Sequence, residues 1–158
     1  MLREQEYVGL LIAVAQRTVK VAAQRHARTL GLTARQFWFL NAARELSGAS
    51  LGEIARRQRM DAPTASRLAE SLARRGLLRT AHDDRDRRAL RVLLTPAGGR
   101  LAEKIAPLAA SVRNAVVQGI SRREQQALKT YLRKVIANLE MFATKAGGER
   151  DVHGGGAA

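Results

Sequence analysis

Arginine side chains dominate the chemistry available between positions 56 and 91. This segment holds eleven arginines against five acidic residues, in a chain whose formal net charge is +14. Guanidinium groups bind phosphates through charge and bind guanine through paired hydrogen bonds. An arginine-rich solvated surface explains any single one of them equally well, Arg74 and Arg75 in particular. Together, the positions of these arginines predict a nucleic-acid partner.

Residues suited to contacting base edges are concentrated in one short stretch after Asp61. Small hydroxyl groups allow close approach to DNA, and arginine is the best reader of guanine. The stretch consists of Ala62, Pro63, Thr64, Ser66 and Arg67. Phosphate contacts are predicted from backbone N–H groups at helix starts. Further phosphate contacts are predicted from Ser50, Arg57 and Arg59.

Two short helices must position these residues. Ser50 and Glu53 are spaced as a capping box, which predicts the start of the first helix, and that helix stops near Met60. Asp61 is suited to cap the second helix and Gly76 to end it. Because so few residues separate the two helices, they must cross steeply, and the second then projects its first turn outward.

A β-hairpin is predicted after the second helix. The segments 77–80 and 89–95 have the composition of strands, and the polar run 82–88 between them predicts a solvated tip. Helix, turn, helix and hairpin together make a winged helix-turn-helix. Three arginines at the tip are placed to enter a narrow minor groove. They are Arg85, Arg87 and Arg88.

Residues 86–98 follow an order that points to a family. The order is Asp86-Arg87-Arg88, three further residues, then Val92-Leu93-Leu94-Thr95-Pro96-Ala97-Gly98. It resembles the wing signature of the MarR family of bacterial transcription regulators, an Asp-x-Arg pair before a Val-x-Leu-Thr-x-x-Gly strand end. The segment 66–77, with Ser66-Arg67-Leu68, Leu72 and Gly76-Leu77, is similar to the family's recognition helix and its exit.

The resemblance implies a homodimer that binds double-stranded DNA, with two helices on either side of the winged module. It also implies that Arg88 reaches the DNA, and that small aromatic or anionic effectors bind between the dimerisation helices and the module. We interpret Asp86 as the ion-pair partner of Arg88 or of another nearby arginine, which would hold the wing in shape.

The predicted fold class is mainly α with a small β-hairpin wing. Apolar residues at heptad spacing run from Leu101 to Ala115 and from Leu128 to Phe142, and we expect both seams to interdigitate with a second subunit. The predicted organisation has four parts. These are N-terminal dimerisation and scaffold helices over 1–46, the DNA-binding module over 47–95, C-terminal dimerisation helices over 96–145 and a disordered tail over 146–158.

An effector cavity is one interpretation of the aromatic residues in the first two helices. Tyr7, His26, Phe37 and Trp38 would line it where the dimerisation helices meet the module. Ordinary core packing explains the same residues, because most aromatics at helical spacing are packing residues. If the cavity exists, its effector would change the separation of two recognition helices, which must lie about 34 Å apart on DNA.

Composition excludes several classes of protein. The chain has no cysteine, which excludes disulfides, cysteine-ligated zinc and thiol redox sensing. The longest apolar run, 7–15, is shorter than the ~20 residues of a membrane span, and the acidic residues before it do not suit a secretory signal. We expect a cytoplasmic protein with no membrane association, no cofactor and no metal. His82 beside three aspartates is discounted as a metal site because adjacent arginines neutralise them.

These observations favour a homodimeric transcription regulator, a ligand-responsive repressor of a pseudo-palindromic operator. The alternative is a low-specificity architectural DNA-binding protein, for which the charge of +14 would suffice. A second rival is an enzyme or a protein-binding adaptor that kept the fold. The enzyme is disfavoured because no nucleophile, base or phosphate-binding loop is recognisable.

Overall fold

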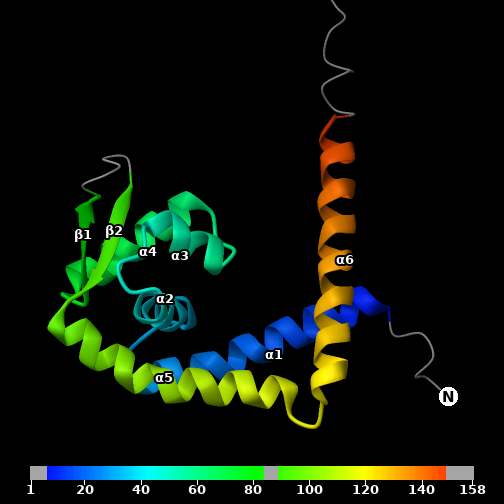
Figure 1. The fold of residues 1–158 in the computed structure, drawn as a ribbon, viewed down its shortest axis with the longest axis horizontal. Coiled ribbons are helices and arrows are strands. Elements are labelled where there is room, and N and C mark those ends of the chain that lie inside the picture. The colour runs from blue at the N-terminus through cyan, green and yellow to red at the C-terminus, as the bar shows by residue number, and fades with distance from the viewer. Residues whose placement is uncertain (1–6, 84–88, 149–158) are drawn as a thin grey trace, which may run out of the picture. The chain divides into compact units, whose positions relative to one another are not determined.

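The computed structural model describes residues 7–83 and 89–148, and these residues are mainly helical with one two-stranded antiparallel sheet (Figure 1). The elements are α1 (Val8–Thr29), α2 (Ala34–Glu45), α3 (Leu51–Arg57), α4 (Ala62–Arg74), β1 (Leu78–His82), β2 (Leu90–Leu94), α5 (Pro96–Val117) and α6 (Arg122–Gly148). The predicted fold class is confirmed. None of these helices is long and apolar enough to cross a membrane. The chain divides into two compact units between Val116 and Val117, and α6 lies in the second.

The core of the first unit is built around α2. Three side chains of this helix, those of Phe37, Phe39 and Leu40, are fully buried. They belong to one cluster with buried residues from the surrounding helices and the hairpin, namely Ile54, Leu72, Val92 and Ile105. Because neighbours cover α2 on several sides, its apolar residues do not form the single stripe of a surface helix.

The apolar seam of α5 is largely used inside its own subunit. Ile105 and Val112 are buried, and Leu101 and Leu108 are half-buried, within the single chain. The prediction that Ile105 and Val112 serve a second subunit is therefore wrong. Heptad spacing marks an apolar helix face but does not say which neighbour covers it, and here the helices and hairpin of the same chain do so.

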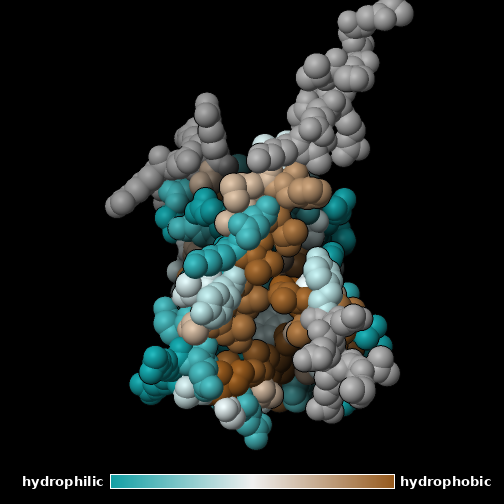
Figure 2. All heavy atoms as spheres, turned by 90° about the vertical axis from the view of Figure 1, so that its right-hand side faces the viewer, coloured by the Kyte–Doolittle hydropathy of each residue, from teal (hydrophilic) through white to brown (hydrophobic). Residues whose placement is uncertain are grey.

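The seam of α6, in contrast, is exposed in the described chain. Leu128, Leu139 and Phe142 are 42%, 59% and 72% exposed, and Figure 2 shows a face on which hydrophobic side chains gather at the surface. The backbone stays helical to Gly148, beyond the predicted boundary at 145. The predicted tail is therefore wrong for 146–148, because glycine weakens a final helical turn without preventing it. The rest of that tail, 149–158, lies outside the described residues.

The wing strands pair in register, with Leu78 opposite Leu94 and His82 opposite Leu90. Pairing thus runs further toward the tip than the predicted strand end at 80. The segment before α3 also joins this sheet, because Ser50 forms a bridge with Arg91 and the chain just before it is hydrogen-bonded to β2. The N-terminus of α3 is therefore attached to β2 of the wing.

Thr95 and Gly98 close the base of the wing against the start of α5. The Thr95 hydroxyl donates to the Gly76 carbonyl at 2.6 Å and accepts from the Gly98 N–H at 3.0 Å. The Thr95 N–H donates to the Leu77 carbonyl at 3.2 Å. A Cβ atom on Gly98 would lie 1.7 Å from that same carbonyl oxygen. Only glycine fits here, because any side chain would push the strand away from the helix.

Replacing Gly98 with Ala should lower the free energy of unfolding by about 3 kcal/mol, because the new methyl group would overlap backbone atoms that cannot rotate away. Urea denaturation followed by circular dichroism would measure the loss. Gly99→Ala is the matched control, since a Cβ there meets nothing within 4 Å and should stabilise the helix by about 0.5–1 kcal/mol. Equal stability of the two variants would contradict this account of the wing base.

Candidate nucleic-acid interface and adjoining cavity

Both helices of the helix-turn-helix begin with the predicted caps. In α3 the Ser50 hydroxyl accepts from the Glu53 N–H at 3.2 Å, and the Glu53 carboxylate accepts from the Ser50 N–H at 2.7 Å. In α4 the Asp61 carboxylate accepts from the Thr64 N–H at 2.7 Å. These backbone hydrogen bonds hold the pKa of Glu53 and the pKa of Asp61 below their ordinary values. Both carboxylates therefore stay charged at the positive ends of their helices.

The structure brings the five predicted base-contacting residues together on the first turns of α4. Ala62, Pro63 and Arg67 are exposed, and Thr64 and Ser66 are half-buried. The opposite side of α4 packs into the first unit through buried alanines and a leucine. α4 thus presents one continuous edge of small, hydroxyl and arginine side chains, as a recognition helix requires.

The three residues predicted to contact phosphate have different surroundings. The Ser50 hydroxyl is already bonded to Glu53, so the capping box occupies it. The side chain of Arg57 is 61% exposed and lies 3.9 Å from a Glu45 oxygen. Arg59 is exposed in the turn between α3 and α4, with φ of 51°.

The predicted wing-tip residues, Arg85, Asp86, Arg87 and Arg88, lie outside the described residues. On β2, near the tip end of the sheet, Arg91 bonds to Asp83 at 2.6 Å and donates to the Gly48 carbonyl at 2.6 Å. Arg91 therefore holds β2 to the loop before α3. Arg75 donates to the Gln36 side chain of α2 at 3.3 Å, which gives this arginine a structural partner within the first unit.

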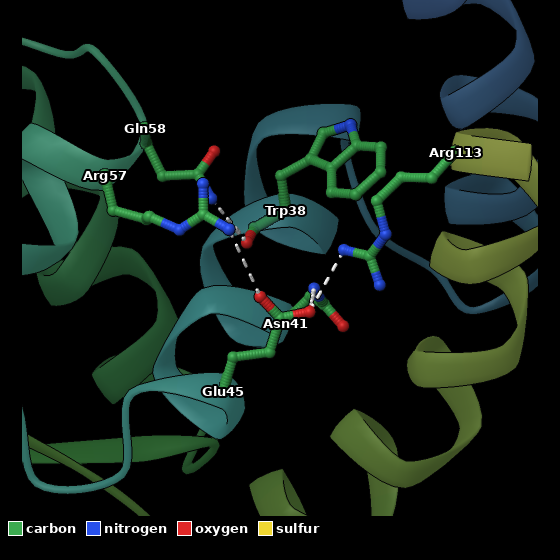
Figure 3. Close-up of polar contacts among 6 residues, drawn as sticks. All are labelled: Trp38, Asn41, Glu45, Arg57, Gln58 and Arg113. Atoms are coloured by element: carbon green, nitrogen blue, oxygen red, sulfur yellow. Dashed lines mark hydrogen bonds and ion pairs between the residues drawn. The ribbon is translucent and has the colours of Figure 1, made fainter. Parts of the chain in front are cut away.

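Charged groups from three helices meet at the C-terminal end of α2 (Figure 3). The Glu45 carboxylate accepts from Asn41 at 2.9 Å and from Arg113 of α5 at 3.0 Å, and it faces Arg57 of α3. We call these four residues the Glu45 cluster. Burial raises the pKa of Glu45, but the hydrogen bond from Asn41 and the two arginines outweigh it and lower the pKa overall. No motif in the sequence indicates this cluster.

Trp38 lies beside the Glu45 cluster and links it to α3. Its backbone carbonyl accepts from the Gln58 side chain at 3.2 Å. The Arg113 guanidinium lies 6.0 Å from the centroid of its ring, and Phe37 packs edge-on at 5.3 Å. Figure 3 shows Trp38, Gln58 and Arg113 side by side. The Trp38 residue is thus held from two sides by α3 and α5.

A cavity of about 480 Å³ lies between α1, α2 and the turn of the helix-turn-helix. Its lining carries three cationic side chains, Lys20, Arg35 and Arg59, and one aromatic ring, Trp38. The remaining lining residues are Gln16, Val19, Ala34, Gln58, Met60, Asp61 and Thr64. Charge and size suit a small aromatic anion, which would stack on the indole and pair with a guanidinium.

Only one of the four predicted pocket residues lines this cavity. Trp38 does so, whereas Phe37 is fully buried in the core, Tyr7 is 75% exposed at the start of α1, and His26 is half-buried elsewhere on that helix. The other three point elsewhere in the single chain, because neighbouring positions on a helix face different directions.

Helix spacing offers a signal for the residues that sequence reasoning missed. Val19 and Lys20 follow Gln16 by three and four positions, so both share a face of α1 with Gln16. Arg35 and Trp38 are likewise three positions apart on α2. In residues 7–83 and 89–148, no group of three or more histidine or acidic side chains could hold a metal ion.

Comparison with known proteins places this geometry in a family. The model of the MarR family matches residues 30–89, which include α2, α3, α4 and β1. The transcriptional repressor NicR of Pseudomonas putida is 30% identical over 131 residues, and the alignment covers 83% of this chain and 83% of that protein.

Two solved structures are similar over most of the chain. BpsR of Bordetella bronchiseptica, solved to explain how 6-hydroxynicotinic acid regulates its DNA binding, is 32% identical with a TM-score of 0.70, over 85% of this chain and 96% of that chain. A MarR mutant from E. coli bound to operator DNA is 22% identical with a TM-score of 0.68, over 81% of this chain and 92% of that chain. The second likeness concerns the fold alone.

Replacing Asp61 with Ala should lower the Tm at neutral pH, because the N–H groups at the start of α4 lose their acceptor. The pKa of Asp61 is lowered from its ordinary value of 3.8. The stability that the charged cap contributes is therefore complete above pH 3.8, and it disappears as the pH falls through the lower pKa of the folded protein. Thermal denaturation from pH 7 to pH 2 should therefore show the two proteins converging in acid. Asp61→Asn keeps a neutral cap and should fall between them at pH 7. A difference in Tm that is the same at every pH would contradict the charged cap.

Proposed function

Because the chain belongs to the MarR family of DNA-binding transcriptional regulators, we propose that it represses transcription by binding a pseudo-palindromic operator as a homodimer, and that a small aromatic anion releases it. Its relatives are regulators and not enzymes. The observation that carries the proposal is the edge of α4. There a capped helix start presents Pro63, Ser66 and Arg67 to solvent on a module with a wing beside it.

The homodimer is supported by apolar surface that the chain leaves uncovered. α1 exposes Leu10, Leu11 and Val14, each more than 40% exposed, and α6 exposes its seam of Leu128, Leu139 and Phe142. Apolar surface of this extent marks an interaction site in most proteins. A second copy is the occupant we propose, because two related recognition helices would then read two half-sites of an inverted repeat.

Ligand response is supported by the cavity. Its three cations and its indole suit an aromatic carboxylate, and the cavity adjoins the turn that precedes the recognition helix. The relative BpsR, whose DNA binding 6-hydroxynicotinic acid regulates, supports the same class of ligand. A ligand held against this turn could change how α4 is presented.

Selection from a random DNA pool at about 150 mM salt, followed by sequencing of the bound fraction, tests the DNA-binding proposal. If the protein is a sequence-specific dimer, the bound fraction should share an inverted repeat whose half-sites are one DNA turn, ~34 Å, apart. An architectural protein would recover no motif, and its binding would fall steeply with salt for every sequence.

Replacing Arg67 with Ala should weaken binding to the selected operator by about 1–3 kcal/mol and relax the base preference at one position in each half-site. Arg59→Gly is the matched control, since removing a side chain proposed to bind phosphate should weaken binding to every sequence alike, and glycine suits the positive φ of this turn. Fluorescence anisotropy with the operator and with a scrambled duplex would separate the two. If Arg67→Ala weakens both duplexes equally, Arg67 does not read a base.

Adding 6-hydroxynicotinic acid should quench or shift the fluorescence of Trp38, the single tryptophan of the chain, and should weaken operator binding about fivefold or more. Its neutral amide is the matched control, because it has the same ring without the carboxylate that the cavity cations attract. The aromatic-anion proposal fails if the amide and the acid act equally, or if neither alters operator affinity.

A further inference from the structure

Arg59 has a backbone conformation that arginine seldom adopts. Among residues 7–83 and 89–148 it is the one non-glycine residue with positive φ, at 51°. It follows the C-cap of α3, where its N–H donates to the Arg56 carbonyl at 3.2 Å and the Met60 N–H donates to the Ala55 carbonyl at 3.0 Å. This is the left-handed turn that ends many helices, and glycine is the residue that fits it best.

The chain uses glycine at its other turns of this kind. Gly31, Gly48, Gly76 and Gly119 all have positive φ, and two of them follow the C-caps of α1 and α4. Keeping arginine in the turn between α3 and α4 therefore sacrifices backbone stability. A side chain retained under strain at a candidate site points to a role for that side chain.

The Arg59 side chain lies at the border of two surfaces. It lines the cavity together with Trp38, Lys20 and Arg35. It also lies in the turn immediately before α4, the helix whose outer edge is proposed to enter the DNA groove, and there it is exposed. Of the three cavity cations, it alone belongs to the helix-turn-helix.

Asp61, the acidic residue in the cavity lining, does not neutralise the positive charge of Arg59. Asp61 directs its carboxylate at the start of α4, where it accepts from the Thr64 N–H at 2.7 Å and from the Thr64 hydroxyl at 3.0 Å. The cavity consequently keeps an excess of positive charge that an anion would satisfy, and Arg59 is the group that a DNA phosphate could equally satisfy.

We propose that Arg59 couples the cavity to DNA binding, by pairing with a DNA phosphate when the cavity is empty and with the anionic group of the effector when the cavity is filled. The proposal rests on the ligand response put forward above. One guanidinium cannot hold both anions in the same geometry, so the two bound states compete directly. No large rearrangement of the helices is then needed for release.

Arg59→Gly is the variant that tests this coupling, because glycine suits the turn and should keep or raise the Tm. The measured quantity is the release factor, which is the operator affinity without 6-hydroxynicotinic acid divided by the affinity at a saturating concentration. Wild type should give a factor of about five or more, and Arg59→Gly should give less than about two. The slope of log affinity against log salt should also become shallower by about 0.9 for each phosphate that the variant no longer neutralises, one in each subunit.

Arg35→Ala is the matched control, because it removes a cavity cation that lies outside the helix-turn-helix. It should raise the concentration of acid needed to alter Trp38 fluorescence and yet keep the wild-type release factor at saturation. Arg59→Lys keeps the charge and should keep most of that factor.

Three results would overturn the coupling role. They are a wild-type release factor in Arg59→Gly, an unchanged salt slope in that variant, or loss of the factor in Arg35→Ala at saturation. A wild-type protein whose operator affinity ignores the acid would instead remove the ligand response itself, and the coupling role with it. The two failures are therefore distinguishable.

Discussion

The Glu45 cluster joins the first helix of the helix-turn-helix to the core of the first unit. α2 is buried in the core of the first unit, so its last turn is a fixed point. From that point the Glu45 carboxylate reaches Arg113 of α5 and faces Arg57 of α3. A carboxylate at the C-terminal end of a helix is disfavoured by the helix dipole, and the two guanidinium groups offset this. α3 therefore has a charged attachment to elements that cannot move independently.

α3 is held at its other end as well, and this determines where α4 lies. Its N-terminus is bridged to β2 through Ser50 and Arg91, while its C-cap residue Gln58 donates to the Trp38 carbonyl. Because only a short turn follows, the direction in which α4 begins is determined by these attachments and by the Asp61 cap. The exposed arginines near the interface each make weak surface interactions singly. The attachment of α3 to the buried helix α2 gives the proposed DNA-binding surface its geometry.

Local features of this fold were predictable from sequence, and features that join distant segments were not. The capping box at Ser50, the cap at Asp61 and the helix end at Gly76 each depend on a few neighbouring residues, and the structure has all of them. The Glu45–Arg113 pair joins residues 68 positions apart, and no local pattern marks it. The prediction that Ile105 and Val112 of α5 contact a second subunit was wrong for the same reason. Periodicity identifies a buried helix face but not the neighbour that buries it. The five residues of α4 predicted to contact bases lie together because one helix carries them all.

The cavity and the proposed DNA-binding surface are two sides of one segment. Residues 58–61 and 64 line the cavity, and 62, 63, 66 and 67 carry the outward edge of α4. A ligand on one side therefore contacts the same few backbone units that position the other side, so coupling between the two needs no path through the core. The same attachments that fix the recognition helix would thus make it sensitive to what occupies the cavity beside it.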